Sequence, residues 1–212
     1  MAHRLLRGVT TWTAAALTCC IGVSAGLAAT SGSNSRRAAA AVTQAQAEQI
    51  GTDAYTYGIP LMDFVRQQRT QTSVPVPNDL SDAPTNQFGS ARQLASARRQ
   101  VFVQPNLDTL YSMAHLDLSG GPLVLHVAAV PNHRYYVLEF LDPYTNVFHY
   151  VGTRATGNGA GTYLITGPSY RGSLPHGLLR IRSSYQHIWI AGRTLVYGPH
   201  DLGKVHRIQN GF

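Results

Sequence analysis

The chain has 212 residues, of which 44% are hydrophobic and only 13% are charged. This length accommodates one domain and an accessory segment, and the low charge favours an exported domain of short strands and loops over a helical cytosolic protein. The formal net charge is +7, but the first 37 residues hold four arginines and no acid, so 13 bases and 10 acids remain elsewhere. Because the remaining arginines are spread singly, the sequence does not indicate a nucleic-acid-binding protein.

The first 41 residues have the layout of a secretory signal. Residues 1–7 are short and basic, residues 8–29 are apolar and uncharged, and small residues follow up to Ala41. This order predicts a signal peptide and flexible leader over residues 1–41, cleaved after Ala29 or, with a better small-x-small match, after Ala41. We therefore expect a secreted or cell-envelope protein with no stable membrane span after cleavage. The alternative is an uncleaved N-terminal anchor, because about 20 apolar residues can cross a bilayer.

Both cysteines, Cys19 and Cys20, lie in the apolar part of this expected signal. After cleavage the domain would contain no cysteine, so we expect neither a disulfide nor a thiolate site. Its stability would then come from the hydrophobic core alone, and roughly 170 residues are enough to form one.

A helix is expected directly after the leader. Thr43 is suited to cap a helix over residues 43–68, in which Ile50, Ala54 and Tyr57 recur at spacings of four and three. This periodicity is typical of an amphipathic helix with one apolar stripe. A glycine and a proline close to Tyr57 predict a kink or a break at that point.

A long loop completes the segment 42–100, which leads into the main domain. Residues 70–96 are polar, contain three prolines and show little periodicity. Long loops inside compact domains are often functional or mobile. A short helix is expected over residues 90–98.

Residues 101–212 have the pattern of an antiparallel β domain. In the first long strand, Leu110, Ala114 and Leu116 fall on one face and are expected to point to the core. Glycine and proline turns separate the apolar–polar alternations, which predicts strands over residues 109–118, 123–130, 134–141, 145–152, 162–166, 178–183 and 186–196. The expected fold is mainly β (α+β): an antiparallel β-sandwich or barrel with an N-terminal helical segment and a short C-terminal helix at 199–209.

Three side chains able to serve a ligand lie at a corner before the first long strand. They are Asn106, Asp108 and Tyr111, within six residues of one another. Asparagine and aspartate also close turns with their own side chains, and this structural explanation weighs about as much as a functional one. In the functional interpretation, Asp108 is a base or an anchoring carboxylate, Asn106 an amide donor or acceptor, and Tyr111 an acid or hydrogen-bond donor.

A second cluster follows the strand expected at 134–141. Asp142 and Asn146 fit a turn, whereas Tyr144 and Arg154 lie at loop edges, where aromatic and guanidinium groups suit a small polar or anionic ligand. The candidate ligand-binding residues are therefore Asn106, Asp108, Tyr111, Tyr144, Asn146 and Arg154.

The sequence contains no His-Glu-x-x-His, no Gly-x-Ser-x-Gly and no phosphate-binding loop ending in Gly-Lys-Ser/Thr. Residues 157–161 are rich in glycine, but they lie between expected strands, where no helix N-terminus is available for a phosphate. The histidines outside the signal are scattered, without the short gaps of a local chelate. We expect no metal site and no cofactor.

Five segments carry motifs that occur in a recognisable order. They read Ala-Tyr-Thr-Tyr-Gly-Ile-Pro-Leu at 54–61, Pro-Asn-x-Asp-Thr-Leu-Tyr-Ser at 105–112, Tyr-Thr-Asn-Val-Phe-x-Tyr-Val-Gly-Thr-Arg at 144–154, Gly-x-Gly-x-Gly-x-Tyr-Leu-Ile at 157–165 and Ile-Trp-Ile-Ala-Gly-Arg-Thr-Leu-Val at 188–196. Over about residues 49–211 the chain resembles the domain-of-unknown-function family twelve fifty-four.

This resemblance implies a bacterial, often exported protein with a mainly antiparallel β fold and no shared reaction. Members of the family usually continue into a second β domain of the jelly-roll type, family twelve fourteen. This chain stops at about the point where that domain would begin. If the family's site lies between the two domains, the resemblance implies that this chain holds half of it and that the other half lies on a separate chain or is absent. The other partners to consider are a second copy of the chain (a homo-oligomer) and a small-molecule ligand.

Three functions are consistent with the sequence. The first is an exported domain that binds a small polar or anionic molecule at the six candidate residues, as part of a two-domain architecture. The second is a secreted enzyme, such as a hydrolase, with Asp108 and Tyr111 in acid and base roles. The third is a structural or envelope interaction module.

Overall fold

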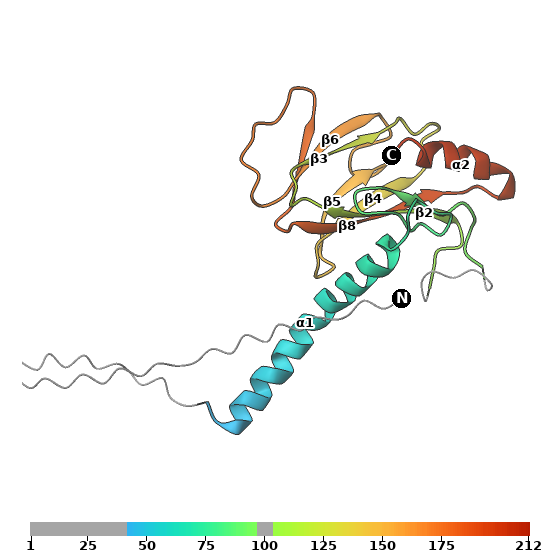
Figure 1. Ribbon diagram of the computed structural model, residues 1–212. Coiled ribbons are helices and arrows are strands. Elements are labelled where there is room, and N and C mark those ends of the chain that lie inside the picture. The colour runs from blue at the N-terminus through green and yellow to red at the C-terminus, as the bar shows by residue number, and fades with distance from the viewer. Residues whose placement is uncertain (1–41, 97–103) are drawn as a thin grey trace, which may run out of the picture. The chain divides into compact units, whose positions relative to one another are not determined.

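The computed structural model of the protein describes residues 42–96 and 104–212. The expected signal peptide at 1–41 and the apolar run at 101–103 lie outside the described residues. Residues Thr43–Phe212 form one compact unit, built of one long helix, two β-sheets and a short C-terminal helix (Figure 1). Within the described ranges, no helix is both long and apolar enough to cross a membrane.

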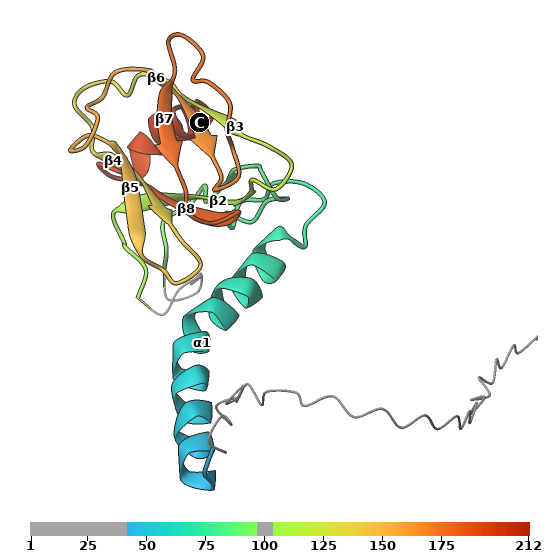
Figure 2. The ribbon, with the colours of Figure 1, turned by 90° about the vertical axis from the view of Figure 1, so that its left-hand side faces the viewer.

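The long helix α1 (Gln44–Thr72) begins where the sequence predicts. The Thr43 hydroxyl accepts a hydrogen bond from the backbone N–H of Gln46, and the Gln46 side chain accepts one from the backbone N–H of Thr43, which forms a capping box. The helix ends four residues later than expected. Pro60 does not split it, although α1 changes direction about midway along its length (Figure 2).

The apolar stripe of α1 packs on the sheet only near its C-terminal end. Phe64 and Gln71 are the buried residues of the helix. The N-terminal part of the stripe is exposed, and Tyr57 is 68% exposed although its ring contacts the ring of Tyr144. In both views α1 lies on the side of the five-stranded sheet opposite β3 and β6 (Figures 1 and 2).

Two sheets form the body of the domain. The five-stranded sheet has the order β1 (Gly89–Ser90), β2 (Thr109–Asp117), β8 (His187–Leu195), β4 (Tyr136–Leu141) and β5 (Val147–Gly152). The three-stranded sheet has the order β3 (Leu123–Val127), β6 (Gly161–Thr166) and β7 (Leu179–Arg182). Among these described strands, every pairing is antiparallel except that of β6 with β7, which is parallel.

The main core lies between the two sheets. Leu138 and Phe140 of β4 and Ile190 of β8 pack against residues of β3, β6 and β7, among them Val127 and Ile181. Two sheets packed face to face over a shared apolar layer form a β-sandwich. The predicted mainly β sandwich fold is therefore confirmed.

Strand β2 is buried on both faces. Leu110, Ala114 and Leu116 point to the core side, as the sequence predicts. On the opposite face, Met113 packs on Leu141 and His115 is covered by α1, so neither is exposed.

The helix expected at 90–98 is wrong over its described part. Gly89 and Ser90 instead pair with Met113 and Ser112 as the edge strand β1, and no helix forms up to residue 96. The Ala91 N–H donates to the Tyr111 carbonyl, which extends this pairing by one bond. A nearby sheet edge therefore prevails over the local helical preference of the segment.

The chain ends in a helical turn η1 (Pro199–Asp201) and helix α2 (Leu202–Gln209), as the sequence predicts. Val205 packs against Leu110 and Val196, which fixes α2 to the ends of β2 and β8. Ile208 joins the main core.

His115 ties α1 to the sheet and makes stability dependent on pH. Its Nε2 lies 2.8 Å from Gln71 Oε1, and its ring stacks on Trp189. Burial lowers the pKa of His115 from 6.5 to about 4. As pH falls, His115 of the unfolded chain binds a proton near pH 6.5, whereas His115 of the folded chain binds one only near pH 4. The contribution of neutral His115 to stability is therefore complete above pH 6.5 and is lost as pH falls to about 4.

We expect the free energy of unfolding to fall by up to ~3 kcal/mol across this window. Urea unfolding of the wild type and of His115→Gln at several pH values in the window measures the effect. Because the pKa of His149 is also lowered by burial and is common to both proteins, the variant should retain a shallower dependence. Equal slopes in the two proteins would show that His115 does not carry the effect.

Candidate functional site

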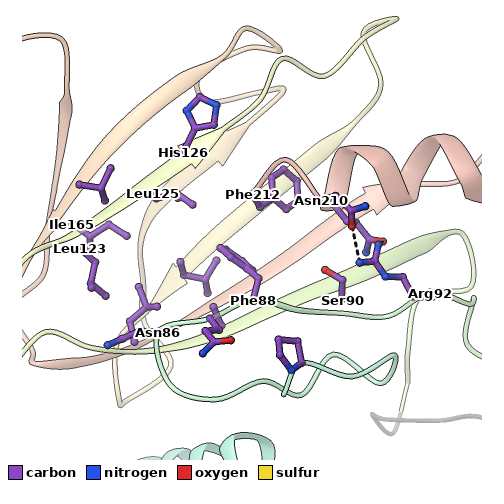
Figure 3. A pocket seen from close by; sticks show the side chains of 17 residues that line it. Asn86, Phe88, Ser90, Arg92, Leu123, Leu125, His126, Ile165, Asn210 and Phe212 are labelled. Carbon is purple, nitrogen blue, oxygen red and sulfur yellow. Dashed lines mark hydrogen bonds between the residues drawn. The ribbon is translucent and has the colours of Figure 1, made fainter. Parts of the chain in front are cut away.

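A cavity of about 530 Å³ opens between the two sheets. It lies where edge strand β1 of one sheet and edge strand β3 of the other run along the same side of the sandwich. Because β1 has only two residues, it covers little of the space between the sheets. We call this space the intersheet cavity (Figure 3).

The walls of the intersheet cavity are apolar and come from both sheets. Leu116 and Ile190 belong to the five-stranded sheet, and Leu125 and Ile165 to the three-stranded one, and all four are buried. The rings of Phe88 and Phe212 approach to 6.0 Å between centroids and lie in the middle of the cavity (Figure 3).

The polar residues that line the cavity are mostly at its rim. Asn86, His126 and Asn210 are exposed, and Arg92 is half-buried. In Figure 3, Arg92, Asn210 and Ser90 gather at one end, and Leu123 and Ile165 lie toward the other. The intersheet cavity thus has a polar end and an apolar end.

Arg92 is held at the polar end by neutral acceptors. Its Nη2 donates to Asn210 Oδ1 at 2.7 Å, and its Nη1 donates to Gln209 Oε1 at 3.3 Å and to the His206 carbonyl at 3.4 Å. Among the ion pairs of the described residues, none involves Arg92. A guanidinium fixed in place without a carboxylate partner attracts an anionic group.

The corner predicted as a ligand site is closed by its own residues. The Tyr111 hydroxyl accepts a hydrogen bond from the backbone N–H of Asn106 at 2.8 Å. Asp108 is exposed, and its carbonyl accepts a bond from the Val196 N–H. Tyr111 and Pro105 line a hollow of about 20 Å³, which is large enough for only a single water molecule.

The second predicted cluster forms a turn between β4 and β5. Asp142 Oδ1 accepts from the backbone N–H groups of Tyr144 at 2.8 Å and Asn146 at 3.0 Å, and the Asn146 side chain donates to the same carboxylate. The ring of Tyr144 lies between those of Tyr57 and Tyr185. Asn146 thus stabilises the turn.

The strand register places the six predicted residues at three separate positions. The corner of Asn106, Asp108 and Tyr111 lies at the end of the sheet where β4 begins, because Thr194 of β8 pairs with both Leu110 and Tyr136. Tyr144 and Asn146 lie beyond the other end of β4. Arg154 follows β5 at the corner's end, but strands β8 and β4 separate it from the corner. The structure therefore does not bring the six residues into one site, and their roles in binding stay predictions.

The residues of the intersheet cavity come together only in the folded chain. No motif in the sequence singles out Phe88, Arg92 or Asn210. They converge because β1 pairs with β2 and α2 folds back beside β1, where Gln209 donates to the Ala91 carbonyl. Within the described part of the chain, no group of three or more histidine, cysteine, aspartate or glutamate side chains is placed to hold a metal ion.

Of the two solved structures described next, the first shares the fold of this chain. The VPA0106 protein from Vibrio parahaemolyticus aligns with a TM-score of 0.60 and 19% sequence identity, over 74% of this chain and 35% of that one. An uncharacterized protein from Burkholderia cenocepacia aligns with a TM-score of 0.37 and 14% identity, over 50% of this chain and 31% of that one. This chain thus spans about a third of the length of either protein.

No protein with a curated description is significantly similar to the chain. A sequence model of one protein family matches residues 85–212, which hold β1 to β8 and both C-terminal helical elements. This is more than half of the chain, and it includes the corner and turn segments whose motifs carry the resemblance. The chain belongs to the family described as "Protein of unknown function (DUF1254)".

Proposed function

We propose that this domain binds a small organic molecule with an apolar body and an anionic end in the intersheet cavity. The observation that carries the proposal is the combination of an apolar interior with the Arg92 guanidinium, which is fixed at one end without an ion pair to any described residue. The small anionic ligand expected from the sequence is thus retained and assigned to a different place in the fold.

The size and chemistry of the cavity support a small ligand. Its volume of about 530 Å³ lies within the range of known small-molecule sites, which are mostly apolar and carry a few polar groups that fix orientation. Burial of an alkyl or aromatic body against Leu116, Leu125 and Ile165 contributes about 25 cal/mol per Å² of apolar surface.

The polar end gives the ligand its orientation. An anion there would accept hydrogen bonds from Arg92 and from the amide of Asn210. Gln209 is buried and donates to the Ala91 and Tyr111 carbonyls, so it holds the floor of this end in place. A rigid donor set loses little entropy when it binds.

The test compares octanoate with octanol, which share a body and differ in charge. We expect octanoate to raise the melting temperature and to bind in calorimetry. Arg92→Gln should weaken octanoate about tenfold, a change of about 1.4 kcal/mol, and leave octanol unaffected. Arg207→Gln is the matched control, because it removes the same charge from an exposed position on α2 outside the cavity lining.

Two outcomes would overturn the proposal. In the first, neither octanoate nor octanol binds the wild type, which removes the cavity as a site for this class of ligand. In the second, Arg92→Gln and Arg207→Gln bind octanoate equally, which removes Arg92 from recognition.

We further propose that the protein works outside the cytoplasm, as residues 1–41 indicate, and that its partner is a jelly-roll-type domain or a second copy of itself. The exposed N-terminal half of α1, with Tyr55 at 75% and Ile50 at 59% exposure, offers a surface for such a partner. Mass spectrometry of the exported protein tests the first point, and a size measurement of the purified protein, alone and mixed with such a domain, tests the second.

A further inference from the structure

A second cavity, of about 400 Å³, lies on the other face of the five-stranded sheet. Leu138, Phe140 and Val151 point into the core, so the alternating residues Val137, Glu139 and Tyr150 point away from it. The strands β4 and β5 form its floor. We call it the outer-face cavity.

The cavity forms because small residues lie between larger ones on the outer face of two paired strands. Val137 pairs with Gly152, so the middle of the floor carries one short side chain and none opposite it. Tyr135 and Arg154 stand at one end, and the paired residues Glu139 and Tyr150 stand at the other. A glycine between large residues leaves room above the sheet without a break in the hydrogen bonding.

One end of this cavity presents a cation. The Arg154 guanidinium carbon lies 5.4 Å from the centroid of the Tyr135 ring, which orients it without neutralising its charge. Arg154 is exposed and forms no ion pair with any described residue. It is therefore available to bind an oxyanion through two parallel hydrogen bonds.

The other end presents the Glu139 carboxylate as an acceptor and the Tyr150 hydroxyl as a donor. Glu139 Oε2 is bonded to Arg193 Nη2, and the two side chains are 20% and 30% exposed. The carboxylate keeps a second oxygen that can accept from a ligand hydroxyl. The lining of the outer-face cavity thus holds one guanidinium, that of Arg154, and one carboxylate, that of Glu139, at opposite ends.

We propose that the outer-face cavity binds a hydroxyl-bearing sugar ring with one anionic group. The anion lies at Arg154, and the ring hydroxyls bond Glu139 and the tyrosine hydroxyls. The apolar C–H face of the ring packs on Tyr150, which is 45% exposed. A carboxylate or a phosphate meets the same requirement at Arg154, because guanidinium pairs with both.

This site is independent of the intersheet cavity. The two lie on opposite faces of the five-stranded sheet, and no described residue lines both. Loss of octanoate binding therefore leaves the inference standing, and loss of sugar-acid binding leaves the proposed function standing.

The test is a calorimetric titration of the full folded domain with glucuronate, glucose 6-phosphate and glucose. We expect at least one of the two anionic sugars to bind, and glucose to bind at least about tenfold more weakly. Tighter binding of glucuronate would identify a carboxylate as the preferred anionic group, and tighter binding of glucose 6-phosphate would identify a phosphate. Equal binding of the two would show that Arg154 accepts either anion.

Variants locate the binding. Arg154→Gln should weaken the anionic sugar about tenfold and remove its advantage over glucose. Tyr150→Ala should weaken all three sugars. Arg171→Gln is the control, because Arg171 is exposed and donates to the carbonyls of nearby Pro168 and Tyr170. The inference is wrong if neither anionic sugar binds the wild type, if glucose binds equally well, or if Arg154→Gln binds as Arg171→Gln does.

Discussion

Replacement of Asp201 by asparagine is expected to lower the free energy of unfolding by about 3–5 kcal/mol. Arg134 is 3% exposed and Asp201 is 8% exposed. Their side chains form a two-bond pair, with Nη1 to Oδ2 at 2.5 Å and Nη2 to Oδ1 at 2.8 Å. An asparagine at this position would leave the buried guanidinium without a counter-charge, and this penalty makes the expected loss large.

The pair joins three elements of the fold. Arg134, just before β4, also donates to the Leu195 carbonyl at the end of β8, and the Tyr197 N–H donates to the Asp201 carboxylate at the start of α2. The hydrogen bond from Arg134 holds the pKa of Asp201 below its usual value. The stability from this carboxylate is therefore present above its usual pKa and is lost only as pH falls through the lowered value.

A surface ion pair supplies the control for this prediction. Asp63 and Arg66 lie 3.0 Å apart on α1, with side chains 60% and 72% exposed. Such a pair contributes at most about 1 kcal/mol, so Asp63→Asn should leave urea unfolding nearly unchanged. Similar losses from Asp201→Asn and Asp63→Asn would contradict a structural role for the buried pair.

Replacement of Gly152 by alanine is expected to lower the free energy of unfolding by about 3 kcal/mol or more. Gly152 has a φ of +153°, and a Cβ there would lie 2.4 Å from the Tyr136 carbonyl oxygen and 2.8 Å from the Val137 Cα. Both contacts are with the backbone of β4, which cannot move without breaking its pairing with β8. The cost therefore combines a disfavoured backbone angle with a collision.

Two further glycines serve to separate the cost of the disfavoured backbone angle from the cost of the collision. Gly157 has a φ of +81° with open space around it, and Gly159 has open space without an unusual φ. Gly157→Ala should cost about 1–2 kcal/mol from backbone strain, and Gly159→Ala close to nothing. Thermal or urea unfolding of the three variants should rank them in that order, with Gly152→Ala the least stable. If Gly152→Ala is no worse than Gly157→Ala, the backbone contact is not a constraint.

The sequence predicted the strands and the terminal helix well because their signals are local. Alternation along residues 109–118 placed Leu110, Ala114 and Leu116 on the core face, and glycine and proline turns bounded the later strands. The parallel pairing of β6 with β7 could not be predicted, since it depends on how residues 167–178 cross between them. The two-sided burial of β2 also required knowledge of where α1 packs.

The candidate site was harder to predict than the fold. Asn106, Asp142 and Asn146 are polar residues near turns, which is the pattern that made them candidates. The side chains of Asp142 and Asn146 are bonded to each other within their turn, and the backbone N–H of Asn106 donates to the Tyr111 hydroxyl. No motif in the sequence marks Arg92 as a site residue. Its contacts with His206, Gln209 and Asn210, more than 100 residues later in the chain, give it a fixed position at a cavity. Arg154 is the predicted residue that does line a sizeable cavity, with partners that the sequence did not indicate.

The most direct measurement is an NMR titration of the ¹⁵N-labelled domain with octanoate. Binding in the intersheet cavity predicts that the amide signals of Ser90, Leu125 and Asn210 and the guanidinium signal of Arg92 shift together, while those of Tyr150 and Gly152 stay in place. Shifts confined to Tyr150 and Gly152, or no saturable shift at Ser90 and Arg92, would contradict the proposed function.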